Sequence, residues 1–145
     1  MYIGIVSEVT EELQVALQRL IPQLGVHKIP PTSEELHELV KSESSTLLAA
    51  RYPDENDAIA GILSLIIYRV PTGIRCIIED VVVDEKMRRL GIGAALIRYA
   101  MELAREARAD GVLLTSNSQR EAANHFYQSL GFELRKINPY FHKLK

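Results

Sequence analysis

The chain has 145 residues, of which 47% are hydrophobic and 25% charged, with a formal net charge of −2 at pH 7. This composition is typical of a globular protein, and we expect a single domain over residues 1–145. The near-neutral charge argues against a nucleic-acid or membrane-surface partner, and no apolar run is long enough to span a bilayer. The single cysteine, Cys76, and the lack of signal-peptide features near the N-terminus predict a cytoplasmic protein.

The first half of the chain predicts a strand, two helices and two more strands. A strand is expected at residues 2–9, and a helix at 10–24, where leucines recur at helical spacing. A second helix is expected at residues 30–43, because Thr32 and Glu35 have the spacing of a capping box. Strands follow at residues 45–52 and 58–69, separated by the turn-rich "PDENDA".

The second half begins with a strand, "CIIEDVVV", that leads through a glycine-containing turn into a helix. One side of that helix is apolar, and Arg98, Glu102, Arg105 and Glu106 mark the polar side. A short strand is expected at residues 111–116. A helix at 118–131 has Ser118 and Glu121 as a capping box and Gly131 as its stop. Strands at 132–137 and 140–144 close a mixed α/β sheet.

The turn "DEKMRRLGIG" raises the question of why two glycines stand where a helix should begin. The first N–H groups of a helix lack internal partners and favour anions, and glycine lets a phosphate approach the backbone closely. Arg88 is positioned to add a charge-assisted contact. A GxG alone is more often an ordinary turn. The Walker pattern fails because no Gly-Lys-Ser/Thr follows, and the dinucleotide pattern fails because its third glycine is missing.

Two blocks together resemble the signatures of the GNAT N-acetyltransferase superfamily. Residues 81–97, "VVVDEKMRRLGIGAALI", contain the Arg-x-x-Gly-x-Gly pattern of its acyl-CoA-binding motif. Residues 120–134, "REAANHFYQSLGFEL", are similar to its second signature, a helix ending in Phe-Tyr and followed by Gly-Phe. One departure is Arg89, where members often carry glycine. The resemblance implies an α/β (α+β) fold with a mixed, mostly antiparallel twisted sheet flanked by about four helices.

The resemblance also implies acetyl-CoA as co-substrate and an amine of a small molecule or peptide as acceptor. The backbone of Val81–Val83 would pair with the pantetheine arm like an added strand. The pyrophosphate would rest on the N–H groups at the start of the following helix. The residues expected to contact acetyl-CoA are Val81, Val82, Val83, Arg88, Arg89, Leu90, Gly91, Ile92, Gly93, Ala94, Asn124 and Tyr127.

The family pattern makes Tyr127 the candidate general acid. With an ordinary pKa of about 10, tyrosine stays protonated at neutral pH and can give a proton to a departing thiolate. The alternative is a core aromatic. However, Arg120, Asn124 and Tyr127 form a polar stripe at helical spacing, which a packing role alone does not explain.

Two adjacent carboxylates, Glu79 and Asp80, interrupt an otherwise apolar strand. Adjacent strand residues face opposite sides of a sheet unless a bulge intervenes. We interpret Glu79 as the candidate base, acting directly or through water, or as a substrate-binding anchor for the ammonium, and Asp80 as a substrate-binding or structural residue. The alternative is that these carboxylates pair with an arginine or cap a loop.

The remaining residues indicate no further chemistry. His27, His37, His125 and His142 lack metal-ligand spacing, so we predict no metal. In the family the first two helices wall the acceptor pocket, so His27 or His37 could touch substrate. The predicted function is an N-acetyltransferase acting on a primary amine. The alternative is a catalytically silent acyl-CoA-binding module or sensor, and a homodimer is left open.

Overall fold

The computed structural model describes residues 1–116 and 119–145. The chain divides into two compact units, Met1–Thr115 and Ser116–Lys145. The first unit contains the sheet with three of the α-helices, and the second contains the C-terminal helix.

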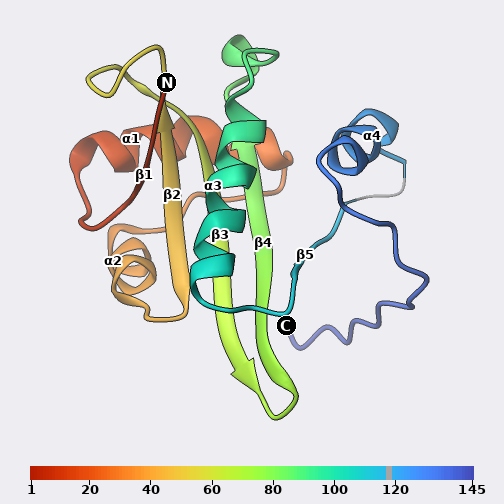
Figure 1. Ribbon diagram of the computed structural model, residues 1–145. Coiled ribbons are helices and arrows are strands. Elements are labelled where there is room, and N and C mark those ends of the chain that lie inside the picture. The colour runs from red at the N-terminus through yellow and green to blue at the C-terminus, as the bar shows by residue number, and fades with distance from the viewer. Residues whose placement is uncertain (117–118) are drawn as a thin grey trace. The chain divides into compact units, whose positions relative to one another are not determined.

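The first unit is built on a sheet whose strands follow the order β1–β2–β3–β4–β5 (Figure 1). The strands are β1 (Tyr2–Ile5), β2 (Ser45–Arg51), β3 (Ile59–Val70), β4 (Gly73–Val83) and β5 (Val112–Leu114). The first four pair antiparallel in chain order, whereas β5 is parallel to β4. The mixed, mostly antiparallel sheet confirms the fold class predicted from the sequence.

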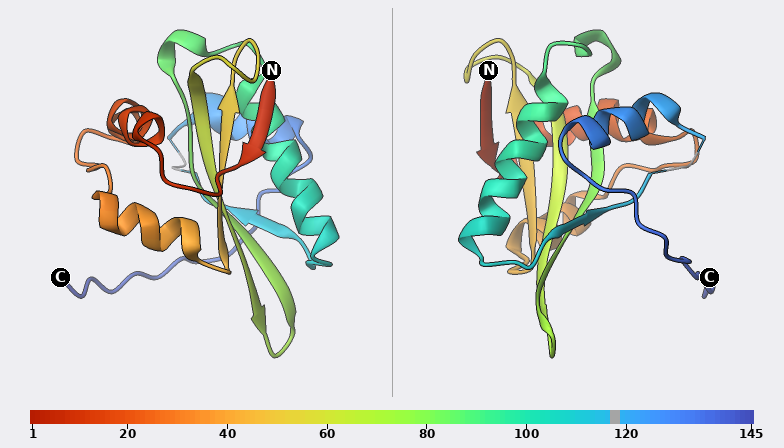
Figure 2. Two further views of the ribbon diagram at one scale, coloured as in Figure 1. Left: turned by 90° about the vertical axis from the view of Figure 1, so that its left-hand side faces the viewer. Right: turned by 45° about the vertical axis from the view of Figure 1, so that its right-hand side comes forward.

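Helices cover both faces of this sheet. Helix α1 (Glu11–Leu20) continues into the short 3₁₀ helix η1 (Ile21–Leu24) and is followed by α2 (Ser33–Lys41). Figure 2 shows α1 and α2 on one face and α3 (Ile92–Glu106) on the other. The core under α1 and α2 buries Leu13, Leu17, Leu20 and Leu36 against Leu47, Ile62 and Val82.

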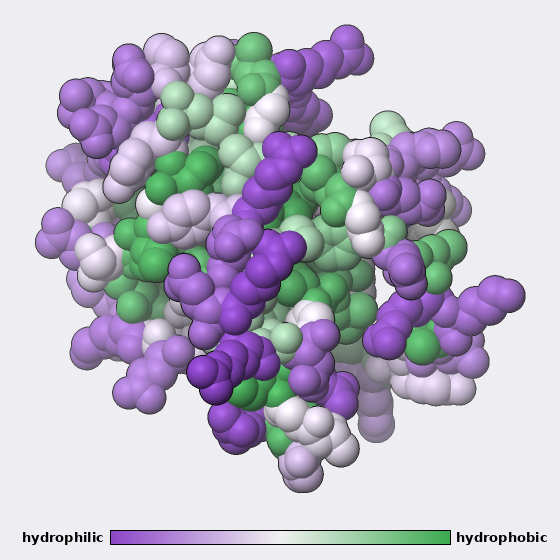
Figure 3. Space-filling model, in the orientation of Figure 1, coloured by the Kyte–Doolittle hydropathy of each residue, from purple (hydrophilic) through white to green (hydrophobic). Residues whose placement is uncertain are grey.

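Local interactions begin these helices as the sequence predicts. In the capping box of α2, the Thr32 N–H donates to Glu35 Oε1 at 2.9 Å and the Glu35 N–H donates to Thr32 Oγ1 at 3.1 Å. The polar side of α3 is exposed at Arg98, Glu102 and Arg105, and Figure 3 shows a band of hydrophilic side chains over this helix. No helix in the described parts of the chain is long and apolar enough to cross a membrane.

The second unit contains α4 (Glu121–Ser129). Gly131 follows with a φ of 94°, a left-handed conformation that favours glycine, which confirms it as the helix stop. The expected capping residue Ser118 lies outside the described residues.

The two predicted C-terminal strands are absent from the described residues 119–145, so this part of the prediction is wrong. From Glu133 onward every residue is exposed, including Leu134, Ile137 and Phe141. An alternating pattern stabilises a strand only when a neighbouring strand accepts its backbone hydrogen bonds and a core covers one face. Residues 132–145 have neither in this structure.

Candidate active site

A bulge in β4 decides where Glu79 and Asp80 lie. Ile62 pairs with Val82 and Ser64 pairs with Glu79, so the two residues Asp80 and Val81 stand opposite Leu63. Asp80 has a φ of 49°, which is unusual for a residue other than glycine. Directly paired residues share a face of the sheet, which places Glu79 on the same face as Ser64. The bulge therefore brings both carboxylates to the face covered by α1 and α2.

A cleft of about 520 Å³ opens on this face of the sheet. Its floor is formed by Leu47, Ile62, Ser64 and Asp80 from three neighbouring strands. Its walls come from α1 and η1 (Leu17, Ile21, Leu24), from α2 (Glu35, Leu39) and from the loop Lys28, Ile29, Pro30 and Pro31. Both candidate carboxylates are exposed, and of the two only Asp80 lines the cleft, whereas Glu79 pairs with Ser64 beside it.

One edge of β4 is open beside the bulge. The parallel pairing with β5 ends at Ile78, and in the described parts of the chain no strand pairs with Glu79–Val83 on the side away from β3. The Arg88 Nε–H donates to the Val83 carbonyl at 3.4 Å, a long hydrogen bond. An extended ligand can therefore add to this short edge through its own amide groups.

The glycine turn leaves open space at the N-terminus of α3. Gly91 is the N-cap with a φ of 81°, and a Cβ added there would meet nothing within 4 Å. The first intrahelical bond recorded for α3 is from the Ala95 N–H to the Gly91 carbonyl at 3.0 Å. The N–H groups of Ile92, Gly93 and Ala94 therefore precede the helical ladder. N–H groups outside the helical ladder, a backbone without a Cβ and the exposed Arg88 side chain are the features that favour an anionic group at this position.

Arg89 is the departure from the family pattern, and its backbone accounts for the glycine that members often carry. Its φ is 65°, in the left-handed region. A side chain in that conformation costs roughly 1–2 kcal/mol. The sequence shows the departure at Arg89, but the backbone strain could not be foreseen from residue type.

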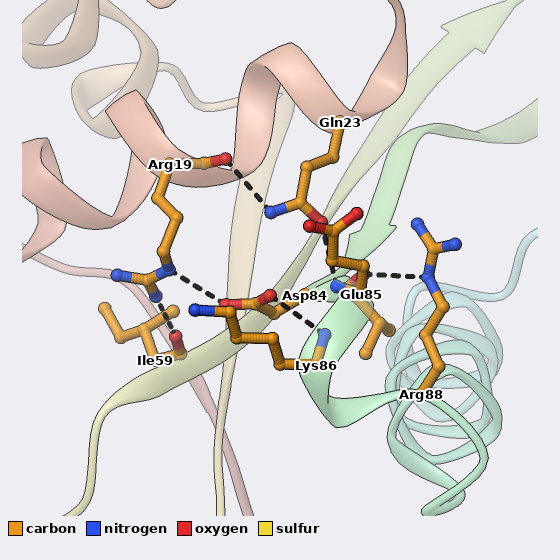
Figure 4. A network of polar contacts seen from close by, with 8 residues as sticks. Arg19, Gln23, Ile59, Asp84, Glu85, Lys86 and Arg88 are labelled. Atoms are coloured by element: carbon orange, nitrogen blue, oxygen red, sulfur yellow. Dashed lines mark hydrogen bonds and ion pairs between the residues drawn. The ribbon is translucent and has the colours of Figure 1, made fainter.

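A polar network ties α1 and η1 to the start of the glycine turn (Figure 4). Arg19 Nε donates to Asp84 Oδ2 at 3.0 Å, and an Arg19 Nη donates to the Ile59 carbonyl at 2.6 Å. The Glu85 N–H donates to Gln23 Oε1 at 2.9 Å. The helix that walls the cleft therefore also holds the turn that follows β4.

Asp84 is the centre of this network and is only 8% exposed. Burial acts to raise its pKa, but hydrogen bonds from the Lys86 N–H, Arg19 and Gln23, with the charge of Arg19, together lower the pKa below its ordinary value of 3.8. Because the folded-state pKa is lowered, ionised Asp84 stabilises the fold fully above that ordinary value. The stabilisation is lost as the pH falls through the folded-state pKa.

We expect Asp84→Asn to lower the free energy of unfolding at pH 7 by about 1–3 kcal/mol. The substitution removes the charged partner of Arg19 and leaves the buried hydrogen-bond donors with a weaker acceptor. The loss relative to the parent should shrink as the pH falls below 3.8. Urea unfolding at several pH values measures both effects. The control is Glu102→Gln, whose carboxylate pairs with Arg105 on the exposed surface of α3 and should cost well under about 1 kcal/mol. Equal losses in the two variants would contradict this role of Asp84.

Tyr127 lies in the second unit, on α4. Its ring centroid is 5.5 Å from that of Phe126 and 6.2 Å from that of Phe132. Burial raises the pKa of Tyr127 above 10.0, and the positive charge of Arg120 partly opposes the rise. The phenol therefore stays protonated throughout the neutral range. Asn124, the middle residue of the predicted polar stripe, is half-buried on the same helix.

Apart from Asp80, the polar residues that line the cleft were not identified from the sequence. Neither His27 nor His37 lines the cleft, whereas Lys28, Glu35 and Ser64 do. The sequence offered one indication, the apolar and proline-containing stretch "KIPP" between two predicted helices. Among the described residues, no group of three or more histidine, cysteine, aspartate or glutamate side chains is placed to hold a metal ion.

The fold and these features define an α/β protein in which a glycine turn and a helix N-terminus follow an open strand edge and a cleft. The sequence pattern of the Acetyltransferase (GNAT) family matches residues 10–132, and the chain belongs to this family. A comparison with curated proteins finds no match.

Solved structures of acetyltransferases share the fold. One is an aminoglycoside acetyltransferase from an uncultured soil metagenomic sample, with a TM-score of 0.85 at 21% identity over 99% of this chain and 96% of that chain. Another is glucosamine-6-phosphate N-acetyltransferase from Arabidopsis thaliana, with a TM-score of 0.76 at 20% identity over 98% of this chain and 99% of that chain. A transcriptional regulator from Bacillus halodurans C-125 has a TM-score of 0.78 at 22% identity over 98% of this chain and 100% of that chain.

Proposed function

We propose that this protein is an N-acetyltransferase that moves the acetyl group of acetyl-CoA to a primary amine of a small molecule or protein. The observation that carries the proposal is the bulge in β4, since the glycine turn follows it along the chain and a carboxylate-bearing cleft lies on the sheet face beside it. Membership of the acetyltransferase family supports the same reaction class.

Acetyl-CoA would be held mainly by backbone groups. The open edge at Val81–Val83 would pair with the amides of the pantetheine arm. The N–H groups of Ile92, Gly93 and Ala94 would receive the pyrophosphate, with Gly91 allowing close approach and Arg88 supplying charge. The bound thioester supplies the acetyl group.

The side chains would then accept and donate the protons that the reaction moves. The amine must be neutral to attack the thioester carbonyl, and Glu79 would accept its proton directly or through water. A bond forms between the amine nitrogen and the carbonyl carbon, and the bond from that carbon to sulfur breaks. Tyr127 would give its phenolic proton to the departing sulfur, and the second proton that the attacking nitrogen loses would restore the phenol. Asp80, in the cleft floor, would bind the ammonium form of the acceptor before it is deprotonated.

Separate variants of the two carboxylates are expected to have different kinetic effects. Glu79→Gln should lower kcat by about a hundredfold and make the pH profile flatter, because a general base is removed. Asp80→Asn should mainly raise KM for the amine, because an ion pair in the bound state is lost. The assay follows thiol release over amines, polyamines, amino acids, aminoglycosides and peptides, with acetyl-CoA saturating.

The panel includes sisomicin, because the structure of a related aminoglycoside acetyltransferase is a complex with that compound. It also includes glucosamine 6-phosphate. An unchanged kcat in Glu79→Gln would show that Glu79 is not the base and that Asp80 or water accepts the proton. Tight CoA binding without acetylation of any amine would contradict the enzyme and leave a silent acyl-CoA-binding module.

A further inference from the structure

We propose that the acceptor is a primary monoamine with a compact apolar body, such as an alkylamine or arylalkylamine, bound in the cleft between η1, α2 and β4. This inference rests on the proposed N-acetyltransferase function and names its substrate class. The ammonium binds at Asp80, and the apolar body lies against the walls formed by the helices and the loop before α2.

The lining of the cleft suits such a body. Nine of the thirteen residues that line it are apolar, and the exceptions are Lys28, Glu35, Ser64 and Asp80. Apolar groups gain about 25 cal/mol for each Å² removed from water, so these walls bind hydrocarbon better than a hydroxylated sugar. The sugar hydroxyls would lose hydrogen bonds to water that leucine, isoleucine and proline cannot replace.

The charges along the lining suit one ammonium group and not several. Asp80 stands in the floor at the bulge, beside the candidate base Glu79. The other carboxylate that lines the cleft, Glu35, already accepts the Thr32 N–H at 2.9 Å in the capping box of α2. Lys28, from the loop before α2, adds a positive charge to the lining. A polyamine or aminoglycoside would bring further ammonium groups toward Lys28 without a matching carboxylate in the lining.

The mouth of the cleft carries an unusually exposed apolar side chain. Ile29 lines the cleft and is 86% exposed. In the same loop, Val26 is 88% exposed but does not line the cleft. An apolar acceptor in the cleft would cover Ile29 and leave Val26 in water. The two residues therefore form a matched pair for an experiment, and their exposure means that either can be replaced with little risk to folding.

The experiment measures amine binding to the CoA-loaded protein, by calorimetry or NMR titration, so that the readout does not require turnover. The probes are hexylamine and phenethylamine, compared with spermidine and sisomicin. We expect both monoamines to bind the parent more tightly than either polycation. Ile29→Asp should weaken monoamine binding about tenfold, because apolar contact is lost, and should strengthen spermidine binding. Val26→Asp, which adds the same charge three residues away, should change each affinity by less than twofold.

Tighter binding of spermidine or sisomicin than of both monoamines would overturn the inference, as would equal effects of the two substitutions. Thiol release is measured in parallel and tests the proposed function separately. Acetylation that prefers polycations would support the acetyltransferase function and contradict the proposal that the acceptor is a monoamine. Monoamine binding that depends on Ile29 without any acetyl transfer would support the proposed binding site and contradict the proposed enzymatic activity.

Discussion

Tyr127→Phe is expected to lower kcat by about a hundred- to ten-thousand-fold, the usual contribution of a general acid. The substitution removes one hydroxyl and keeps the ring that lies near Phe126 and Phe132. The melting temperature and the affinity for acetyl-CoA should therefore change little. Because burial raises the pKa of Tyr127 above 10.0, the parent should not lose activity through deprotonation of this phenol until the pH exceeds 10.0.

The matched control is Tyr140→Phe, because Tyr140 belongs to the same unit and is 91% exposed. That variant should keep the kcat of the parent. Turnover, CoA affinity and melting temperature are measured on the same preparations with saturating donor. If Tyr127→Phe retains kcat within about threefold of the parent, the proton comes from water or another side chain, since an acid contributes far more. A lower melting temperature with intact turnover would instead identify a packing role.

Gly91→Asp is expected to weaken CoA binding by about a hundredfold or more. The side chain would project into the open space at the start of α3, and its negative charge would oppose that of the phosphates. Aspartate and asparagine tolerate a left-handed backbone better than most residues. The φ of 81° at this position should therefore be retained in Gly91→Asp and also in Gly91→Asn.

Gly91→Asn is the matched control for charge, because the asparagine side chain fills the same space without a negative charge. We expect its CoA affinity to fall between those of the parent and the aspartate variant. Gly91→Val combines steric obstruction with backbone strain, and its melting temperature must be measured before its binding is interpreted. Calorimetry that gives the parent's CoA affinity in a folded Gly91→Asp or Gly91→Val variant would exclude this site.

Most elements of the fold could be predicted because their determinants are local. The leucine spacing of α1, the Thr32–Glu35 capping box and the glycine that follows α4 each act within a few residues. The strands at 132–137 and 140–144 were predicted wrongly because residue types favourable to a strand do not supply the partner that it must pair with. Their pairing would depend on residues far away in the sequence.

The site was predictable at its glycine turn and less so at its cleft. The bulge that turns Asp80 into the cleft depends on how β4 pairs with β3, which residue types do not specify. The ion pair between Arg19 and Asp84 joins residues 65 positions apart. The adjacent carboxylates in an apolar strand did indicate Glu79 and Asp80 as candidate site residues. They did not indicate which face of the sheet each side chain occupies.

The open edge of β4 is too short to offer a good template for aggregation. Unpaired strand edges ordinarily invite other chains to add to a sheet. Here the edge runs only from Glu79 to Val83, begins at a bulge and ends where Arg88 donates to the Val83 carbonyl. A second polypeptide strand would need a longer and flatter register than this segment provides. The ligand that we propose for this edge has only a few amide groups and needs no longer segment, so the shortness that suits such a ligand also discourages the addition of further chains.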